Sequence, residues 1–342
     1  MKAVVLVGGE GTRLLPLTET IPKPLLPFMN RPFLDHVLDH LSEHGIDEVV
    51  CSSPYLEAVF HSFLETRKGR APSVRWITEA EPLGTAGAIA GARDLLAGTF
   101  LAMNGDILTD MDLGALVEMH RARNAVATIA VHRVDDTRPF GLIESEPDGR
   151  VVAFREKPQD PLAGAINAGV YVLEPGALAG VPAGRMVSIE RETYPDLIAR
   201  GQAVYAALAA GYWLDLGTPE AYLQAHFDAL DGRIAEYRDV ARPYLAEGAR
   251  VEAGAVMGAH VVMGLGAVVA AGAEVDRSVL HAGATVAGEA RVVSSILGPG
   301  AAVGAGAEVR GSVLAEGAVA ADGARLVGER VSPGKVVGAA AG

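Results

Sequence analysis

The strongest constraint on this chain is a six-residue repeat in its last third. Aliphatic residues recur every six positions, and a second small or aliphatic residue follows each of them four positions later. Repeats of this length are typical of parallel β-helices, in which each hexad forms one face of a triangular coil and points an aliphatic side chain inward. The first series is Val251, Met257, Met263, Val269 and Val275, and the second is Ala255, Val261, Ala267, Ala273 and Val279.

This repeat predicts a left-handed parallel β-helix over residues 236–342. Weaker copies follow at Val286 and Val292, and again at Val303 and Val309, with breaks of register between them. A low-complexity Ala/Gly linker is the alternative, but it would not keep five hexads in register. Because the exposed edges of such a helix need cover, we expect a homo-oligomer formed through this domain.

Residues 1–235 have a different pattern, in which short apolar runs alternate with helical spacing. This alternation predicts a Rossmann-like α/β domain with a largely parallel sheet, and the closely spaced strands after Gly141 predict that the sheet is mixed. Helices are expected around Leu34–Leu41, Ile189–Ala199 and Pro219–Leu230. The expected strands are Ala3–Val7, Glu48–Ser52, Val74–Thr78, Thr99–Asn104, Ala127–Val134, Gly141–Ser145, Val151–Phe154 and Ala168–Leu173.

Charge and cysteine content exclude several classes of protein. The 42 acidic residues outnumber the 29 basic ones, and the net charge of −13 argues against nucleic acid or a membrane surface as partner. Cys51 is the only cysteine, so an intramolecular disulfide is excluded. The apolar run Ala3–Val7 is too short for a signal sequence, and no run approaches about 18 residues, so we expect a soluble cytoplasmic protein.

A glycine-rich loop, Gly8-Gly9-Glu10-Gly11-Thr12-Arg13-Leu14, follows the first expected strand. Glycines at the end of a parallel strand let backbone N–H groups approach a phosphate closely. The loop is neither a dinucleotide fingerprint nor a Walker loop, because an arginine closes it. A lysine, Lys23, follows between two prolines.

The motifs after the first loop are Pro22-Lys23-Pro24, Leu83–Gly87, Asn104-Gly105-Asp106, Phe140-Gly141, Glu156-Lys157-Pro158, Ile166–Gly169, Ser188-Ile189-Glu190 and Tyr212–Gly217. Their order over residues 1–230 resembles that of the nucleotide-sugar pyrophosphorylases, or sugar-phosphate nucleotidyltransferases, and a hexad tail also occurs in that family. The Ser-Ile-Glu and Trp-Leu-Asp-Leu-Gly stretches look most like GDP-mannose pyrophosphorylases. The resemblance implies that GTP and mannose 1-phosphate, a hexose 1-phosphate, give GDP-mannose and pyrophosphate.

Such a reaction needs positioning and charge neutralisation rather than a nucleophilic triad. A sugar 1-phosphate is mostly dianionic at neutral pH, because its second pKa is about 6, and it needs no general base. We expect Arg13 to hold the departing pyrophosphate through its planar donors, and Lys23 to lie against the reacting phosphates. Asp106 and Asp215 are expected to hold Mg²⁺, a hard cation that prefers oxygen ligands.

The resemblance also assigns binding roles to residues along the motifs. Lys157 is expected to contact the sugar phosphate. The expected nucleotide-binding residues are Val7, Gly8, Gly9, Gly11, Thr12, Glu79, Gly84 and Thr85, and the expected sugar-binding residues are Gly141, Glu156, Asn167, Gly169 and Glu190.

Glu79 lies where the family places the side chain that faces the edge of the nucleobase. A carboxylate has only acceptors, and guanine presents two adjacent donors, N1–H and N2–H₂. Uracil, thymine and adenine present an acceptor beside a donor, which an amide would match better. Glu79 therefore favours GTP over dTTP or UTP, the nucleotides of the nearest alternative reaction with glucose 1-phosphate.

Each of these residues also has an ordinary structural interpretation. Asp106 and Asp215 could be turn residues, Lys23 a solvated turn lysine, Asn167 a β-bulge residue, and Glu79 a partner of Arg75.

Two alternatives concern the whole protein. A non-catalytic nucleotide-sugar sensor is disfavoured because the basic and acidic residues of the reaction are retained. A β-helix acyltransferase could use His260 or His281 as a base, but we expect both histidines at the surface or at corners. Every matched motif lies upstream of Gly232, so the tail is expected to assemble subunits rather than to act in the reaction.

Overall fold

The computed structural model describes residues 1–54 and 57–338. The chain divides into two compact units, one built from Met1–Gly9 and Leu34–Trp213 and the other from Glu10–Phe33 and Leu214–Gly342. The segment Glu10–Phe33, which includes Arg13 and Lys23, therefore packs with the C-terminal part of the chain. A domain boundary after residue 235 stays a prediction.

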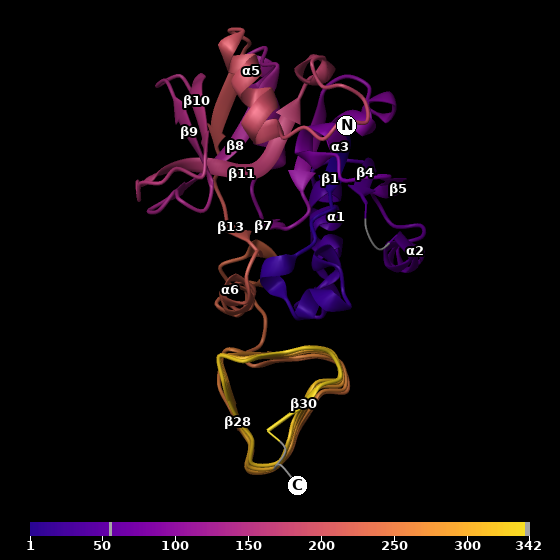
Figure 1. Cartoon of the computed structure of the whole chain (residues 1–342), viewed down its shortest axis with the longest axis vertical. Coiled ribbons are helices and arrows are strands. Elements are labelled where there is room, and N and C mark those ends of the chain that lie inside the picture. The colour runs from indigo at the N-terminus through magenta and orange to yellow at the C-terminus, as the bar shows by residue number, and fades with distance from the viewer. Residues whose placement is uncertain (55–56, 339–342) are drawn as a thin grey trace. The chain divides into compact units, whose positions relative to one another are not determined.

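The first unit is built on a nine-stranded mixed sheet, as predicted (Figure 1). Four neighbouring strands are parallel, and the others include antiparallel pairs. The strands, in the order β10-β9-β11-β6-β1-β4-β5 with β8 beside β11 and β12 beside β8, are β10 (Val151–Glu156), β9 (Gly141–Ser145), β11 (Gly164–Leu173), β6 (Phe100–Asn104), β1 (Lys2–Leu6), β4 (Glu48–Ser53), β5 (Ser73–Thr78), β8 (Ala127–Val134) and β12 (Val204–Leu208).

The helices agree with the sequence analysis only in part. The expected helix over Pro219–Leu230 is confirmed as α6, whereas Ile189–Ala199 divides into a π-helical turn, Ile189–Thr193, and α5 (Tyr194–Ala199). No helix among the described residues is long and apolar enough to cross a membrane. The other helices are α1 (Phe33–Glu43), α2 (Glu57–Thr66), α3 (Gly84–Gly91) and α4 (Leu113–Ala122), and the short strands are β2 (Pro27–Phe28), β3 (Arg31–Pro32), β7 (Ile107–Thr109) and β13 (Trp213–Asp215).

The carboxyl ends of the parallel strands define where a site can form. Leu6 of β1 pairs with Ser52 of β4 on one side and with Asn104 of β6 on the other. The glycine-rich loop after β1 therefore starts beside the ends of two neighbouring strands. Ligands of open α/β sheets bind outside such carboxyl ends.

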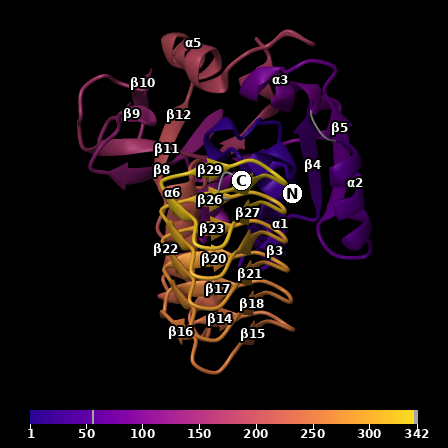
Figure 2. The ribbon, with the colours of Figure 1, turned by 60° about the horizontal axis from the view of Figure 1, so that its bottom comes forward.

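The C-terminal domain is a parallel β-helix, whose coils overlie one another as a triangle in Figure 1 and are seen stacked in Figure 2. Its three faces are three parallel sheets. The first contains β14 (Tyr244–Leu245), β17 (Val261–Met263), β20 (Ser278–Leu280), β23 (Ile296–Leu297), β26 (Val313–Leu314) and β29 (Arg330–Val331). The second contains β15 (Arg250–Val251), β18 (Val268–Val269), β21 (Thr285–Val286), β24 (Ala302–Val303), β27 (Val319–Ala320) and β30 (Val336–Val337), and the third contains β16 (Val256–Met257), β19 (Glu274–Asp276), β22 (Arg291–Val293), β25 (Glu308–Arg310) and β28 (Arg325–Val327).

The register breaks in the hexad pattern come from a shortened coil. Tyr244 pairs with Val262, 18 residues further on, as three hexads require. From the next coil the partners of this sheet are 17 residues apart, as in the pair Val261 and Ser278. One corner of each later coil is a single residue with positive φ, and these residues are Arg277 (45°), Ser294 (48°), Gly311 (54°) and Gly328 (69°). The buried aliphatic residues keep the same spacing of 17 at Met263, Leu280, Leu297, Leu314 and Val331.

Three corner serines, Ser278, Ser295 and Ser312, follow three of these single-residue corners and are buried. The Ser278 hydroxyl donates to the carbonyl two residues before it at 2.7 Å and accepts the N–H of Ser295 at 3.1 Å. Ser295 and Ser312 repeat this pattern, and Ser312 accepts the N–H of Glu329 at 3.1 Å. The serine hydroxyls thus satisfy backbone groups at the short corner of each coil.

Candidate active site

A cavity of about 230 Å³ lies in the first unit, where the parallel strands end. Its lining comes from the loop after β1, the end of β4, the loop after β5 and the start of α3. Val7 is buried directly before this loop, and its N–H donates to the Ser52 carbonyl at 3.2 Å. The cavity brings together five of the expected nucleotide-binding residues, which are Gly8, Gly9, Glu79, Gly84 and Thr85.

Glu79 is 7% exposed, and two protein donors fix its carboxylate. One oxygen accepts the Ser52 hydroxyl at 2.8 Å, and the other accepts the N–H of Leu83 at 3.0 Å. The alternative partner Arg75 instead pairs with Glu48 at 3.1 Å, so that interpretation of Glu79 was wrong. Because a carboxylate offers about four acceptor positions, two remain for a ligand in the cavity.

The motif Leu83–Gly87 is needed for close packing. A Cβ at Gly84 would lie 2.7 Å from the carbonyl oxygen of Val187, so the chain before Ser188 passes directly over α3. Thr85 then joins the two segments, since its hydroxyl donates to Glu190 at 2.8 Å and accepts the N–H of Ile189 at 2.7 Å. The cavity at the strand ends is therefore connected directly to an expected sugar-binding residue.

Two carboxylates from different segments approach each other near this connection. Burial raises the pKa of Glu156, and the charge of Glu190 raises it further. The Lys157 ammonium lies 4.0 Å from Glu156 on an exposed side chain. A Cβ at Gly141, which pairs with Glu156 across β9 and β10, would lie 3.0 Å from the Glu156 carboxylate. These expected sugar-binding residues are thus neighbours.

Asn167 lies at a β-bulge, as its structural interpretation predicted. The pairing of β11 with β8 shifts between Asn167 and Tyr171. The Asn167 amide donates to the Tyr171 hydroxyl at 2.8 Å, and its oxygen accepts the N–H of Gly169 at 3.0 Å. Gly169 has a φ of 72°, and a Cβ there would lie 2.9 Å from the Asn104 amide nitrogen. The bulge therefore orients Asn167, and the positive φ of Gly169 lets the chain pass close to Asn104.

Asp106 lies in the turn after β6, and its charge acts on Tyr171 of β11. The pKa of the buried Tyr171 is raised well above its usual value, first by burial and then by the charge of Glu190. The charges of Glu156 and Asp106 raise it further. The charges of three expected site carboxylates therefore raise the pKa of the same tyrosine hydroxyl, whereas its hydrogen bond with Asn167 lowers it.

The second unit places two cations beside one carboxylate. Lys23 is 8% exposed, so it is not a solvated turn lysine, and its ammonium lies 3.5 Å from Asp215. The Arg13 guanidinium lies 3.6 Å from the other oxygen of Asp215. Gly11 has a φ of 64° before the turn Thr12–Leu14, and a Cβ at Gly217 would overlap Arg13. The glycines of both motifs thus leave room for the cationic side chains.

The two expected metal ligands, Asp106 and Asp215, offer the oxygen donors that a hard cation such as Mg²⁺ prefers. Among the described residues, no group of three or more His, Cys, Asp or Glu side chains gathers to hold a metal. Mg²⁺ commonly uses one or two protein carboxylates, because water and substrate phosphates complete its octahedron. That Asp106 and Asp215 are ligands of this kind stays a prediction.

The two histidines of the β-helix have structural roles. His281 starts the corner turn after β20, as expected of a corner residue, but it is 2% exposed and therefore does not lie at the surface. Its Nε2 lies 3.0 Å from the Tyr222 hydroxyl. Burial lowers its pKa to about 4. His260 is 3.0 Å from Asp231. His281 therefore packs α6 against the β-helix and is poorly placed to serve as an acyltransfer base.

Sequence reasoning missed Ser52 and Tyr171, which orient Glu79 and Asn167. Ser52 could have been found as a polar residue at the end of an apolar strand. Tyr171 gave no such signal, because it lies within the apolar run Gly169–Leu173.

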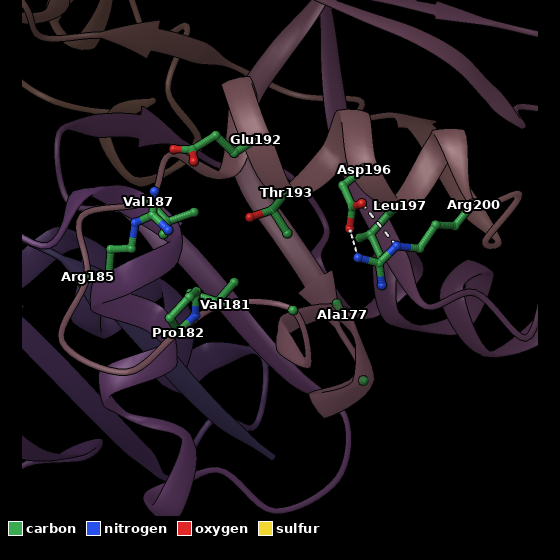
Figure 3. A pocket seen from close by; sticks show the side chains of 12 residues that line it. Ala177, Val181, Pro182, Arg185, Val187, Glu192, Thr193, Asp196, Leu197 and Arg200 are labelled. Carbon is green, nitrogen blue, oxygen red and sulfur yellow. Dashed lines mark hydrogen bonds and ion pairs between the residues drawn. The ribbon is translucent and has the colours of Figure 1, made fainter.

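A second cavity, of about 240 Å³, lies beside α5 (Figure 3). Asp196 and Arg200 form an ion pair at its edge at 2.7 Å, and Glu192 and Thr193 line it. None of the expected site residues is among its described lining residues. It shares no described lining residue with the cavity at the strand ends.

Comparison with known proteins identifies the family. The family described as Nucleotidyl transferase matches residues 2–232, and the GMPPB C-terminal domain matches residues 240–341. The chain therefore belongs to the nucleotidyl transferase family and is a sugar-phosphate nucleotidyltransferase, so this prediction is confirmed.

The names of similar proteins are more specific than the description of the family. The chain is 39% identical over 291 residues to mannose-1-phosphate guanylyltransferase of Mycobacterium tuberculosis, which covers 83% of this chain and 80% of the relative. It is 36% identical over 311 residues to mannose-1-phosphate guanylyltransferase 1 of Arabidopsis thaliana, with 86% and 85% covered. The crystal structure of HddC from Yersinia pseudotuberculosis complexed with GMP-PN is similar with a TM-score of 0.58 and 29% identity, over 66% of this chain and 97% of that chain.

Proposed function

We propose that this enzyme is a mannose-1-phosphate guanylyltransferase, which forms GDP-mannose and pyrophosphate from GTP and mannose 1-phosphate. Relatives with that name match more than four fifths of the chain. A similar solved structure holds the guanine nucleotide analogue GMP-PN. The observation on which the proposal chiefly rests is the buried carboxylate of Glu79 in the cavity at the strand ends.

The environment of Glu79 supports a guanine base. Its two bonds to Ser52 and Leu83 fix the plane of the carboxylate without using all of its acceptor positions. The remaining positions match the adjacent donors N1–H and N2–H₂ of guanine. A thymine or uracil edge would turn its O4 acceptor toward one carboxylate oxygen, and a buried acceptor that faces an acceptor loses its hydrogen bond.

The transfer itself is an in-line displacement. A phosphate oxygen of mannose 1-phosphate forms a bond to the α-phosphorus of GTP while the bond to the bridging oxygen of the β-phosphate breaks. Pyrophosphate leaves with that electron pair, and no proton needs to move. Arg13 holds the departing pyrophosphate, Lys23 neutralises charge on the reacting phosphates, and Lys157 binds the sugar phosphate.

Mg²⁺, held by Asp106 and Asp215, would add positive charge at the α-phosphate. Asp215 already lies beside Lys23 and Arg13, so it also orients these two cations. Glu156, Asn167, Glu190 and the backbone of Gly141 and Gly169 hold the sugar hydroxyls. The hydrogen bond from Thr85 to Glu190 connects this group to the nucleotide cavity.

The other candidate reaction joins dTTP or UTP to glucose 1-phosphate on the same machinery, and Glu79 disfavours it. A matrix assay of GTP, ATP, dTTP and UTP against mannose 1-phosphate and glucose 1-phosphate, with pyrophosphate release as readout, tests the choice. We expect the highest kcat/KM for GTP with mannose 1-phosphate. A preference for another pair would contradict the proposed substrates, and the absence of turnover with every pair would favour a non-catalytic sensor.

A further inference from the structure

The segment Glu10–Phe33 is held by the C-terminal part of the chain at several points. The Met29 N–H donates to His226 of α6 at 3.3 Å, and the Asn30 amide donates to the Met263 carbonyl of β17 at 3.1 Å. The Tyr222 hydroxyl donates to the Pro27 carbonyl. Because that proton is used, the bond between Tyr222 and His281 requires the proton on His281 Nε2.

Three further hydrogen bonds come from two residues near the end of the β-helix. Arg330, at the start of β29, donates from one guanidinium nitrogen to the carbonyl of Arg13 at 3.2 Å and to that of Leu15 at 3.1 Å. The Ser332 hydroxyl donates to Glu19 at 2.9 Å. The turn that presents Arg13 is therefore attached by its backbone to the last strand of one β-helix face.

We propose that Arg330 is a positioning residue for Arg13, and that the β-helix thereby takes part in the reaction as well as in any assembly of subunits. This inference rests on the proposed function, in which Arg13 holds the departing pyrophosphate. Arg330 touches no reacting atom. It binds the carbonyl of Arg13 within the turn Thr12–Leu14 and the carbonyl of Leu15 directly after it, and so it determines where the Arg13 guanidinium lies relative to Asp215.

The exposure of Arg330 makes its role separable from stability. Exposed hydrogen bonds contribute little to the free energy of unfolding, so Arg330→Ala should fold normally. Displacement of a charge-stabilising group, by contrast, can lower turnover by up to about 100-fold. We expect Arg330→Ala to lower kcat by about 10- to 100-fold while KM for GTP changes little.

The test compares purified full-length variants in steady-state kinetics, thermal unfolding and hydrogen exchange. Arg330→Lys should recover part of kcat, because an ammonium can still donate to a carbonyl. Arg330→Ala should add nothing to the loss in Arg13→Ala, since two residues that act through one guanidinium are not additive. Arg291, an exposed β-helix arginine that pairs with Glu274, supplies the matched control Arg291→Ala, which should behave as wild type.

Hydrogen exchange reports on the turn without any substrate. The N–H groups of Leu14 and Leu15 are bonded within the turn, and they should exchange faster in Arg330→Ala than in Arg291→Ala. Equal kcat and equal exchange in those two variants would overturn the inference, as would fully additive losses with Arg13→Ala. Absence of turnover in the wild type would instead contradict the proposed function. The exchange rates would then still show whether Arg330 holds the turn Thr12–Leu14 in place.

Discussion

Replacing Glu79 by glutamine tests base recognition with almost no change in size. In the wild type, the carboxylate accepts from the Ser52 hydroxyl and from the Leu83 N–H. The N–H of Leu83 can only donate, so the glutamine oxygen must face it. The Ser52 hydroxyl can turn and accept, so the glutamine NH₂ should lie on the side of Ser52. Both bonds to the protein can thus be kept, and thermal stability should change little.

The ligand, in contrast, meets a different edge. Guanine presents two donors, and in Glu79→Gln one of them faces the new NH₂. Leaving a buried polar group unpaired costs about 1–3 kcal/mol, which corresponds to a loss of about 5- to 150-fold in kcat/KM for GTP. The amide can donate to O4 and accept from N3–H of a pyrimidine, so dTTP and UTP should become better substrates.

Competition between GTP and dTTP for wild type and Glu79→Gln measures this shift directly. Glu81→Gln is the matched control, because Glu81 is exposed two residues further along the same loop, and it should leave the ratio unchanged. An unchanged GTP-to-dTTP ratio in a folded Glu79→Gln variant would refute the role of Glu79 as the base reader.

Four other variants test the metal ligands, the corner serines and the buried histidine. Asp106→Asn and Asp215→Asn should each lower kcat by about 100- to 1,000-fold with unchanged melting temperature, and near wild-type rates at low Mg²⁺ would contradict their assignment. Ser295→Ala should cost about 1–3 kcal/mol in denaturant unfolding, because the N–H of Ser312 loses its acceptor; an unchanged midpoint would argue against the corner serines as a stabilising feature. His281 has a pKa of about 4 in the folded chain against an ordinary value of 6.5, so the unfolded chain binds the proton more tightly. The free energy of unfolding is therefore highest above pH 6.5 and should drop by about 3 kcal/mol as the pH falls toward 4. Melting temperatures across that range should fall less steeply for His281→Gln, which can still donate to Tyr222.

The parts of the fold that repeat or alternate could be predicted from the sequence. The hexads from Val251 to Val275 predicted the β-helix. The predicted ends of β1 and β6, at Val7 and Asn104, agree with the structure to within one residue. Local patterns are informative there because each strand or coil buries its side chains with a fixed period. The same holds for Pro219–Leu230, where Thr218 caps the helix by accepting the N–H of Ala221.

The parts that depend on distant neighbours could not be predicted. Helix α3 was missed because Ala86–Ala90 is buried, so it lacks an amphipathic pattern. The burial of the corner residue His281 was not predicted, because nothing near it in the sequence indicates that Tyr222 would accept its proton. The packing of Glu10–Phe33 with the β-helix also depends on contacts over more than 200 residues, such as that of Asn30 with Met263.

The regular 17-residue coil fixes the distance between two contacts that the β-helix makes with the N-terminal segment. Met263 in β17 accepts a bond from Asn30, and Arg330 in β29 holds the turn with Arg13, with four inter-strand steps between them. At about 4.8 Å per step the two points are about 19 Å apart. Loss or gain of one whole coil would keep every aliphatic side chain inside, yet it would move Arg330 by about 5 Å and release the turn. The number of coils between these points is thus set by the reach of the N-terminal segment.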